Sequence, residues 1–171
     1  MWTISARRSD CKTTMIKVVK SLFSLRSYGF KSDKWALLLC LLVLLPTFVW
    51  MAFPVPDDLL RIESCTSVWD TVGSVFQTVM MAALCLLRNR QASSHCSVPL
   101  RWSIVVMLLL YWLAWLLYYA GFFNMLILML LVVPPCLCFV LFAWERRNAL
   151  ALLSAIGFLC CHLVFTVMNF L

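Results

Sequence analysis

His162 is the residue whose type and position most clearly allow chemistry inside a membrane. It lies within residues 149–171, an apolar run that carries no Asp, Glu, Lys or Arg. A helix rises about 1.5 Å per residue, so His162 lies about 20 Å from the start of this run, roughly half-way across a bilayer. An ionisable group at that depth indicates a functional site. The alternative is a neutral imidazole that hydrogen-bonds Gln77 or a backbone carbonyl and holds two helices together.

A stripe of polar residues on a second apolar run lies at a matching depth. Asp70, Ser74 and Gln77 follow one another at spacings of four and three, which places them on one helical face. His162 and Asn169 are seven residues apart and share a face in the same way. Lipid cannot satisfy the hydrogen bonds of such faces, so they point into a bundle. We therefore expect Gln77 near His162 in a polar seam between two helices. Asp70 is expected near Asn169 in the same seam, which is the candidate binding site.

No set of residues in the sequence predicts an enzyme, a metal centre or a cofactor site. The sequence has no Gly-rich phosphate loop, no G-x-S-x-G or H-E-x-x-H motif and no paired acids at membrane depth. The pairs Cys136/Cys138 and Cys160/Cys161 differ in depth by roughly 5–10 Å, a poor fit to one tetrahedral zinc site. We therefore expect no catalytic residue, no metal and no cofactor.

The composition indicates that the membrane is the solvent of this chain. Of its 171 residues, 64% are hydrophobic and 12% are charged, and the mean hydropathy is +0.97. An ordinary soluble domain is about half apolar and about a quarter charged, so a soluble protein of this size could not bury so much apolar surface. The apolar runs are continuous and do not alternate with period two, which favours helices over a barrel. The predicted fold class is an all-α integral membrane bundle.

The run from Trp102 to Trp144 shows how two of the spans are joined. Its 43 residues include no Asp, Glu, Lys or Arg, which is too long for one span of about 20 residues and about right for two. Gly121 takes positive φ readily and Asn124 tolerates turns, so a tight hairpin is predicted there. Further along, Pro134 and Pro135 remove two backbone donors. The helix is expected to kink at these prolines, up to a division into two half-helices.

Runs of about 20 apolar residues without charge predict five spans in all. Together they make residues 35–171 one transmembrane domain. They are expected at about 35–55, 69–87, 102–119, 125–144 and 149–171. The loops alternate between basic and non-basic: thirteen of the fourteen Lys and Arg residues fall in 1–34, 88–101 and 145–148. The positive-inside rule then predicts a cytoplasmic N-terminus and an external C-terminus. The expected location is the cell membrane, as a multi-pass protein.

The basic arm 1–34 precedes the transmembrane domain. In residues 13–26 one helical face carries Met15, Val18 and Leu22, which predicts a short amphipathic helix lying on anionic lipids of the inner leaflet. The alternatives are a disordered arm that only sets orientation, and an organellar targeting peptide. Nucleic-acid binding is not expected, because no soluble module carries the positive charge.

These features favour a non-enzymatic accessory or interaction subunit, because polar groups are few and loops are short. The alternative is a small-solute or proton transporter that works as an oligomer, with a path lined by His162, Gln77 and the Pro134–Pro135 kink. A water-filled cavity reaching His162 would favour transport, and a dry bundle would favour the subunit. A membrane-protein partner or a second copy of the chain fits either hypothesis. Cys65 in the loop after the first span is expected to be a free thiol, with a disulfide to another chain as the alternative.

Overall fold

The computed structural model describes residues 28–56, 58–61, 65–90 and 97–170. Its dominant feature is a set of five helices, each long and apolar enough to cross a membrane. They are α2 (Lys34–Ala52), α3 (Ser67–Leu86), α4 (Val98–Tyr119), α5 (Met125–Glu145) and α6 (Ala149–Phe170). They confirm five long apolar helices at the predicted places, with boundaries that differ by four residues or fewer. The amphipathic helix predicted at 13–26 lies outside the described residues.

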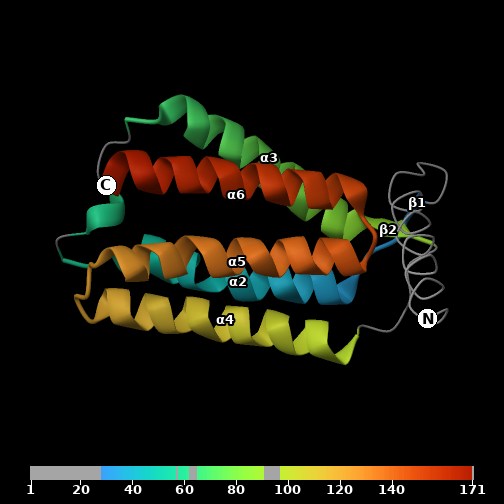
Figure 1. The fold of residues 1–171 in the computed structure, drawn as a ribbon, viewed down its shortest axis with the longest axis horizontal. Helices are drawn as coiled ribbons and strands as arrows, with labels where there is room; N and C mark the ends of the chain where they lie inside the picture. The colour runs from blue at the N-terminus through green and yellow to red at the C-terminus, as the bar shows by residue number, and fades with distance from the viewer. Residues whose placement is uncertain (1–27, 57, 62–64, 91–96, 171) are drawn as a thin grey trace, which may run out of the picture.

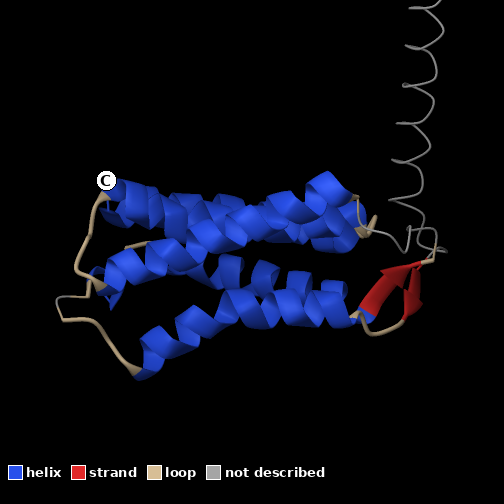
Figure 2. Ribbon diagram, turned by 90° about the horizontal axis from the view of Figure 1, so that it is seen from below, coloured by secondary structure: helices blue, strands red, loops and turns tan. Residues whose placement is uncertain are grey.

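The five long helices form a bundle with α5 at its centre. Helices α4 and α6 flank α5, α3 packs against α6, and α2 lies behind α5 in the view of Figure 1. A pair of short strands lies at one end of the bundle, where α2, α4 and α6 begin (Figures 1 and 2). We call this end the sheet end. The opposite end carries the 3₁₀ turn η2 (Leu59–Arg61), and we call it the η2 end.

Side chains that cap the backbone set where three of these helices begin. Asp33 begins α2 by accepting the backbone N–H two residues further on, at 3.0 Å. Asn124 and Asn148 begin α5 and α6 by accepting the N–H three residues further on, at 3.0 and 3.1 Å. Such caps satisfy donors that the first turn of a helix leaves free. Gly121, at φ +87°, ends the α4 segment. The tight hairpin predicted between α4 and α5 is therefore confirmed.

The strand pair at the sheet end was not predicted. Strand β1 (Tyr28–Phe30) pairs antiparallel with β2 (Leu87–Asn89), with Gly29 opposite Arg88. The pairing continues in the backbone bond from Lys31 N–H to the Leu86 carbonyl, at 3.0 Å. Each strand is three residues long, which is too short to show alternation between apolar and polar residues. The sheet ties the chain before α2 to the end of α3.

Helix α5 is the most buried of the five long helices, and its side chains are apolar on all sides. That pattern is typical of a helix enclosed by others. Pro134 and Pro135 are both buried, and the helix runs through them without interruption from Met125 to Glu145. The division into two half-helices that the prolines made conceivable is therefore wrong. A single helix is retained because α4 and α6 pack along both sides of α5 and hold it in place.

Helices α3 and α6 pack closely because each places a glycine in their contact: Gly157 of α6 lies against Phe76, and Gly73 of α3 lies against Cys161. A Cβ placed on Gly157 would come within 2.9 Å of the Phe76 ring. A Cβ on Gly73 would lie 3.3 Å from the Cβ of Cys161. Small residues let helix backbones approach in a membrane, where apolar burial alone does not drive association. Gly73 and Gly157 therefore allow the close approach of α3 and α6.

Candidate functional site

A cavity of about 270 Å³, which we call the central cavity, lies between the five long helices. Each helix contributes to its wall, including Thr47 from α2, Gln77 from α3, Trp115 from α4, Pro135 from α5 and His162 from α6. Most of the other lining side chains are aliphatic or aromatic. A mostly apolar wall with a few convergent polar groups is the usual form of a small-molecule site.

Three hydroxyl groups in this wall, those of Thr47, Tyr111 and Thr166, have hydrogen-bond partners within the bundle. The Tyr111 hydroxyl donates to the Val43 carbonyl at 3.0 Å and lies 3.4 Å from the Thr47 hydroxyl. The Thr166 hydroxyl donates to the backbone carbonyl one turn earlier, at 2.8 Å. These groups are satisfied by the protein, so they line the cavity without calling for a ligand.

Three other polar groups in the wall make no hydrogen bond with any residue that the structure describes. They are the Gln77 amide, the His162 imidazole and the indole N–H of Trp115, which is buried. The Trp115 ring lies beside the Tyr111 ring, but the Tyr111 hydroxyl donates to the Val43 carbonyl and does not accept from the Trp115 indole N–H. Of the three, the Trp115 indole nitrogen is the buried atom, and a buried donor without an acceptor costs free energy, so its position in the wall calls for a physical reason. A bound molecule or water in the cavity would supply it.

A second cavity of about 210 Å³, which we call the side cavity, lies between α3 and α6. Its wall includes Asp70 and Ser74, and it shares Gln77, Phe158 and His162 with the central cavity. The shared residues therefore lie where the two cavities adjoin. The His162 ring packs on Phe158 with ring centroids 4.4 Å apart. That contact holds the imidazole between the two cavities.

The four residues of the predicted seam therefore have different surroundings. Asp70, Gln77 and His162 all line the side cavity. Gln77 and His162 share a cavity wall, but no hydrogen bond joins them. Asn169 lines neither cavity: its amide donates to the Thr66 hydroxyl at 3.0 Å, and that hydroxyl donates to Asp70 at 3.4 Å. Asn169 thus clamps the start of α3 to the end of α6.

The two prolines of α5 also differ in their surroundings. Pro135 lines the central cavity and Pro134 does not. A proline lacks an N–H, so Pro135 gives no helical hydrogen bond to the carbonyl of Leu131, which also lines the cavity. Pro135 therefore shapes one wall of the cavity, and the two prolines do not divide the helix.

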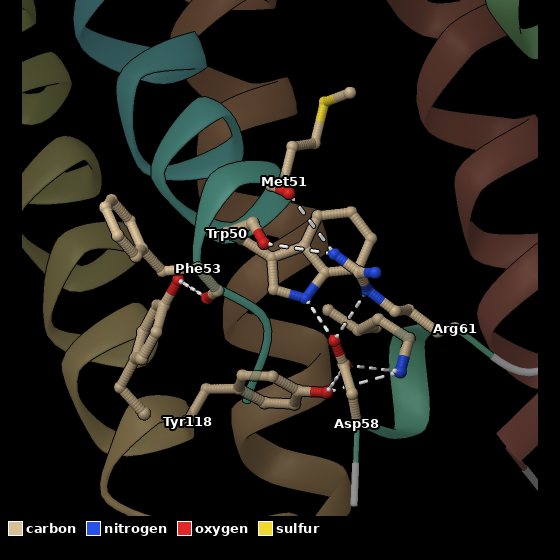
Figure 3. Close-up of polar contacts among 8 residues, drawn as sticks. Trp50, Met51, Phe53, Asp58, Arg61 and Tyr118 are labelled. Carbon is tan, nitrogen blue, oxygen red and sulfur yellow. Dashed lines mark hydrogen bonds and ion pairs between the residues drawn. The ribbon is translucent and has the colours of Figure 1, made fainter. Parts of the chain in front are cut away.

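Asp58 is a buried polar centre at the η2 end that the sequence did not single out. Figure 3 shows Trp50 and Tyr118 pointing at its carboxylate from α2 and α4. The indole N–H of Trp50 donates to it at 2.6 Å, and the Tyr118 hydroxyl donates at 2.6 Å. Arg61 forms an ion pair with it at 3.3 Å and lies over the Trp50 ring, 5.1 Å from the centroid. We call Trp50, Asp58, Arg61 and Tyr118 the Asp58 cluster.

The Asp58 cluster closes the central cavity at the η2 end. Trp50 lines the cavity, and so does Leu60, whose backbone N–H donates to Asp58 at 3.1 Å. The Trp50 ring also lies against the Trp115 ring, with centroids 6.3 Å apart. The cavity wall at this end is thus fixed by hydrogen bonds to one carboxylate.

One sequence pattern could have found this cluster: an acidic residue at the same end of the predicted spans as Trp and Tyr residues. Trp and Tyr at a membrane boundary need partners for their polar tips. Asp58 lies two residues after Pro56, at the same boundary as Trp50 and Tyr118. An acid at that depth is a natural acceptor for both.

The cysteines of the described segments do not form a metal site. No three His, Cys, Asp or Glu side chains lie close enough to share a metal ion in the described part of the chain. The sulfurs of Cys40 and Cys85 lie 3.9 Å apart between α2 and α3. Cys65 is an exposed free thiol near the end of α6.

Comparison of the chain with protein-family models, with curated proteins and with solved structures finds no match.

Proposed function

We propose that this chain is a multi-pass membrane protein that binds a small solute, or a proton with its water, in the central cavity and passes it toward the side cavity. The observation that carries the proposal is that Gln77 and His162, without hydrogen-bond partners in the described structure, line both cavities. Polar groups at membrane depth that face a cavity are typical of solute and proton paths. The fold itself is compatible with a membrane protein.

The hydrogen-bonding groups in the walls of the two cavities determine which solutes the protein could carry. Trp115 offers only a donor, Gln77 offers a donor and an acceptor, and a neutral His162 offers one of each. The rest of the central wall is apolar. A small uncharged molecule with at least one hydrogen-bond acceptor fits this wall. A proton fits as well, because His162 can bind one and Asp70 lies in the adjoining cavity.

The orientation follows from the charges at the two ends of the bundle. Among the described residues, every Lys and Arg except Arg61 lies at the sheet end. With that end in the cytoplasm, as the positive-inside rule requires, the side cavity and Asp70 lie toward the external half. The cell membrane and the anionic inner leaflet beside the basic arm are part of this proposal.

Flux into vesicles tests the proposal. The purified protein is placed in phosphatidylcholine vesicles, and entry of three probes is followed: protons with a trapped pH dye, and glycerol and urea by light scattering. At least one probe is expected to enter faster than in protein-free vesicles. His162→Leu is expected to slow that probe about tenfold, the effect of one lost hydrogen bond of about 1.4 kcal/mol at the barrier.

The matched control is His95→Leu, which removes the other histidine of the chain and should leave the flux unchanged. Unaltered flux in His162→Leu would reject the path through His162. If none of the probes enters faster than in protein-free vesicles, the interaction-subunit hypothesis becomes the better account. Short connections between the described helices are the observation that favours that hypothesis.

A further inference from the structure

A lateral groove of about 370 Å³ lies between α2 and α4 at the sheet end. Helix α2 makes only slight contact with α4, so the two helices leave space between them. Phe142 of α5 lies in the groove, with Leu38 and Leu42 on the α2 side and Val105 and Leu108 on the α4 side. Leu38 and Val105 are exposed, so the groove opens sideways into the membrane and not into the central cavity.

The groove carries its charge at the end that meets the headgroup region. Arg101 lies in the first turns of α4 and lines the groove. Its guanidinium makes no ion pair or hydrogen bond with any residue that the structure describes. Trp35, also in the groove, is two-thirds exposed at the start of α2. An aromatic ring and a cation at the same level are typical of the membrane interface.

Two other charged residues in the groove are already engaged. Arg146 forms an ion pair with Asp33 at 3.1 Å and lies over the Phe142 ring, 5.1 Å from its centroid. The Glu145 carboxylate accepts from the Ser97 backbone N–H at 2.9 Å, at the start of α4, where a helix favours negative charge. Arg101 is thus the cation of the groove that is available to an anion.

The surroundings of the groove are strongly basic. Two acids, Asp33 and Glu145, are described at the sheet end. They face a larger set of described cations at that end: Lys31, Lys34, Arg88, Arg90, Arg101, Arg146 and Arg147. Such an excess of positive charge attracts anionic lipid over zwitterionic lipid. The positive charge of this end favours an anionic headgroup, and the apolar groove below it favours an acyl chain. Both features therefore select an anionic lipid.

We propose that this groove is a specific site for one anionic glycerophospholipid. Its phosphate pairs with Arg101, and one acyl chain lies between Leu38 and Leu42 of α2 and Val105 of α4. The acyl chain then fills the space that α2 and α4 leave open. This site differs from the contact expected of the basic arm, and it does not depend on the solute proposed for the central cavity.

Competition between two lipids of equal chain length tests the site. The purified full chain in detergent is mixed with dioleoyl phosphatidylglycerol and dioleoyl phosphatidylcholine at equal amounts, and bound lipid is counted by native mass spectrometry. One phosphatidylglycerol is expected to remain bound, with a preference of about tenfold over phosphatidylcholine. Arg101→Gln is expected to remove that preference.

Arg88→Gln is the matched control, because it removes one positive charge at the same end without touching the groove. It should keep the preference. Val105→Trp, which fills the groove from its exposed wall, should displace the lipid while Arg101 stays in place. Equal losses in Arg101→Gln and Arg88→Gln would overturn the proposal, because the preference would then come from diffuse charge. Retention of bound lipid in Val105→Trp, or no lipid preference in the unaltered protein, would overturn it as well.

Discussion

Replacing Asp58 by alanine is expected to lower the free energy of unfolding by about 3–5 kcal/mol. Hydrogen bonds to a charged acceptor contribute about 1.5–3 kcal/mol each. The substitution takes that acceptor from Trp50 and Tyr118 at once. The Asp58 side chain is only 5% exposed, so water replaces it poorly. Thermal loss of helical circular dichroism in detergent, compared with the unaltered protein, measures the effect.

Arg61→Gln separates the hydrogen bonds from the ion pair. The Arg61 side chain is 45% exposed, and ion pairs of exposed residues contribute about 0–1 kcal/mol. Its removal is therefore expected to change stability far less than Asp58→Ala does. If both variants lost the same stability, the carboxylate would act mainly as the partner of Arg61. That result would contradict the description of Asp58 as the shared acceptor of two helices.

Replacing Asp33 by alanine is expected to cost about 3–4 kcal/mol at the other end of the bundle. The substitution leaves the Arg146 guanidinium, 14% exposed, without its partner at 3.1 Å, and an uncompensated buried charge is strongly destabilising. It also removes the cap of α2, which contributes about 1 kcal/mol. The same thermal measurement gives the total.

Asp33→Asn divides this total into its two parts. Asparagine caps a helix about as well as aspartate, so it keeps the acceptor for the first turn of α2. It removes only the charge that faces Arg146. The asparagine variant should therefore lie between the alanine variant and the unaltered protein, closer to the alanine variant. An asparagine variant as stable as the unaltered protein would show that the ion pair contributes nothing.

The sequence predicted the helices well because their causes are local. Runs of apolar residues as long as a bilayer is thick require a helix. The turn between α4 and α5 depends on Gly121 and Asn124, which lie within a few residues of each other. The polar stripe of Asp70 and Gln77 follows from helical spacing alone, and its helix packs against the one that carries His162.

The parts that could not be predicted depend on contacts between distant residues. The partners of Asp58 come from positions 8 and 60 residues away, and the sequence places them at the same boundary without showing that they touch. The β1–β2 pairing joins segments far apart in the chain through backbone bonds, which leave no trace in the side chains. Pro134 and Pro135 do not by themselves predict whether α5 divides, because the packing around the helix decides that. The cavities are equally invisible, since they depend on how five helices fit together.

Water access to the two adjoining cavities tests the central claim most directly. Gln77→Cys and His162→Cys are made singly in a cysteine-free background and exposed, in membranes, to a small membrane-impermeant thiol reagent. Cys65, which is exposed, is restored as the positive control. Ala151→Cys, at a fully buried position of α6 that lines neither cavity, is the negative control. The proposed function predicts labelling at positions 77 and 162 and none at 151. Absence of labelling at both 77 and 162, with Cys65 reactive, would contradict it and leave a dry bundle that serves a partner.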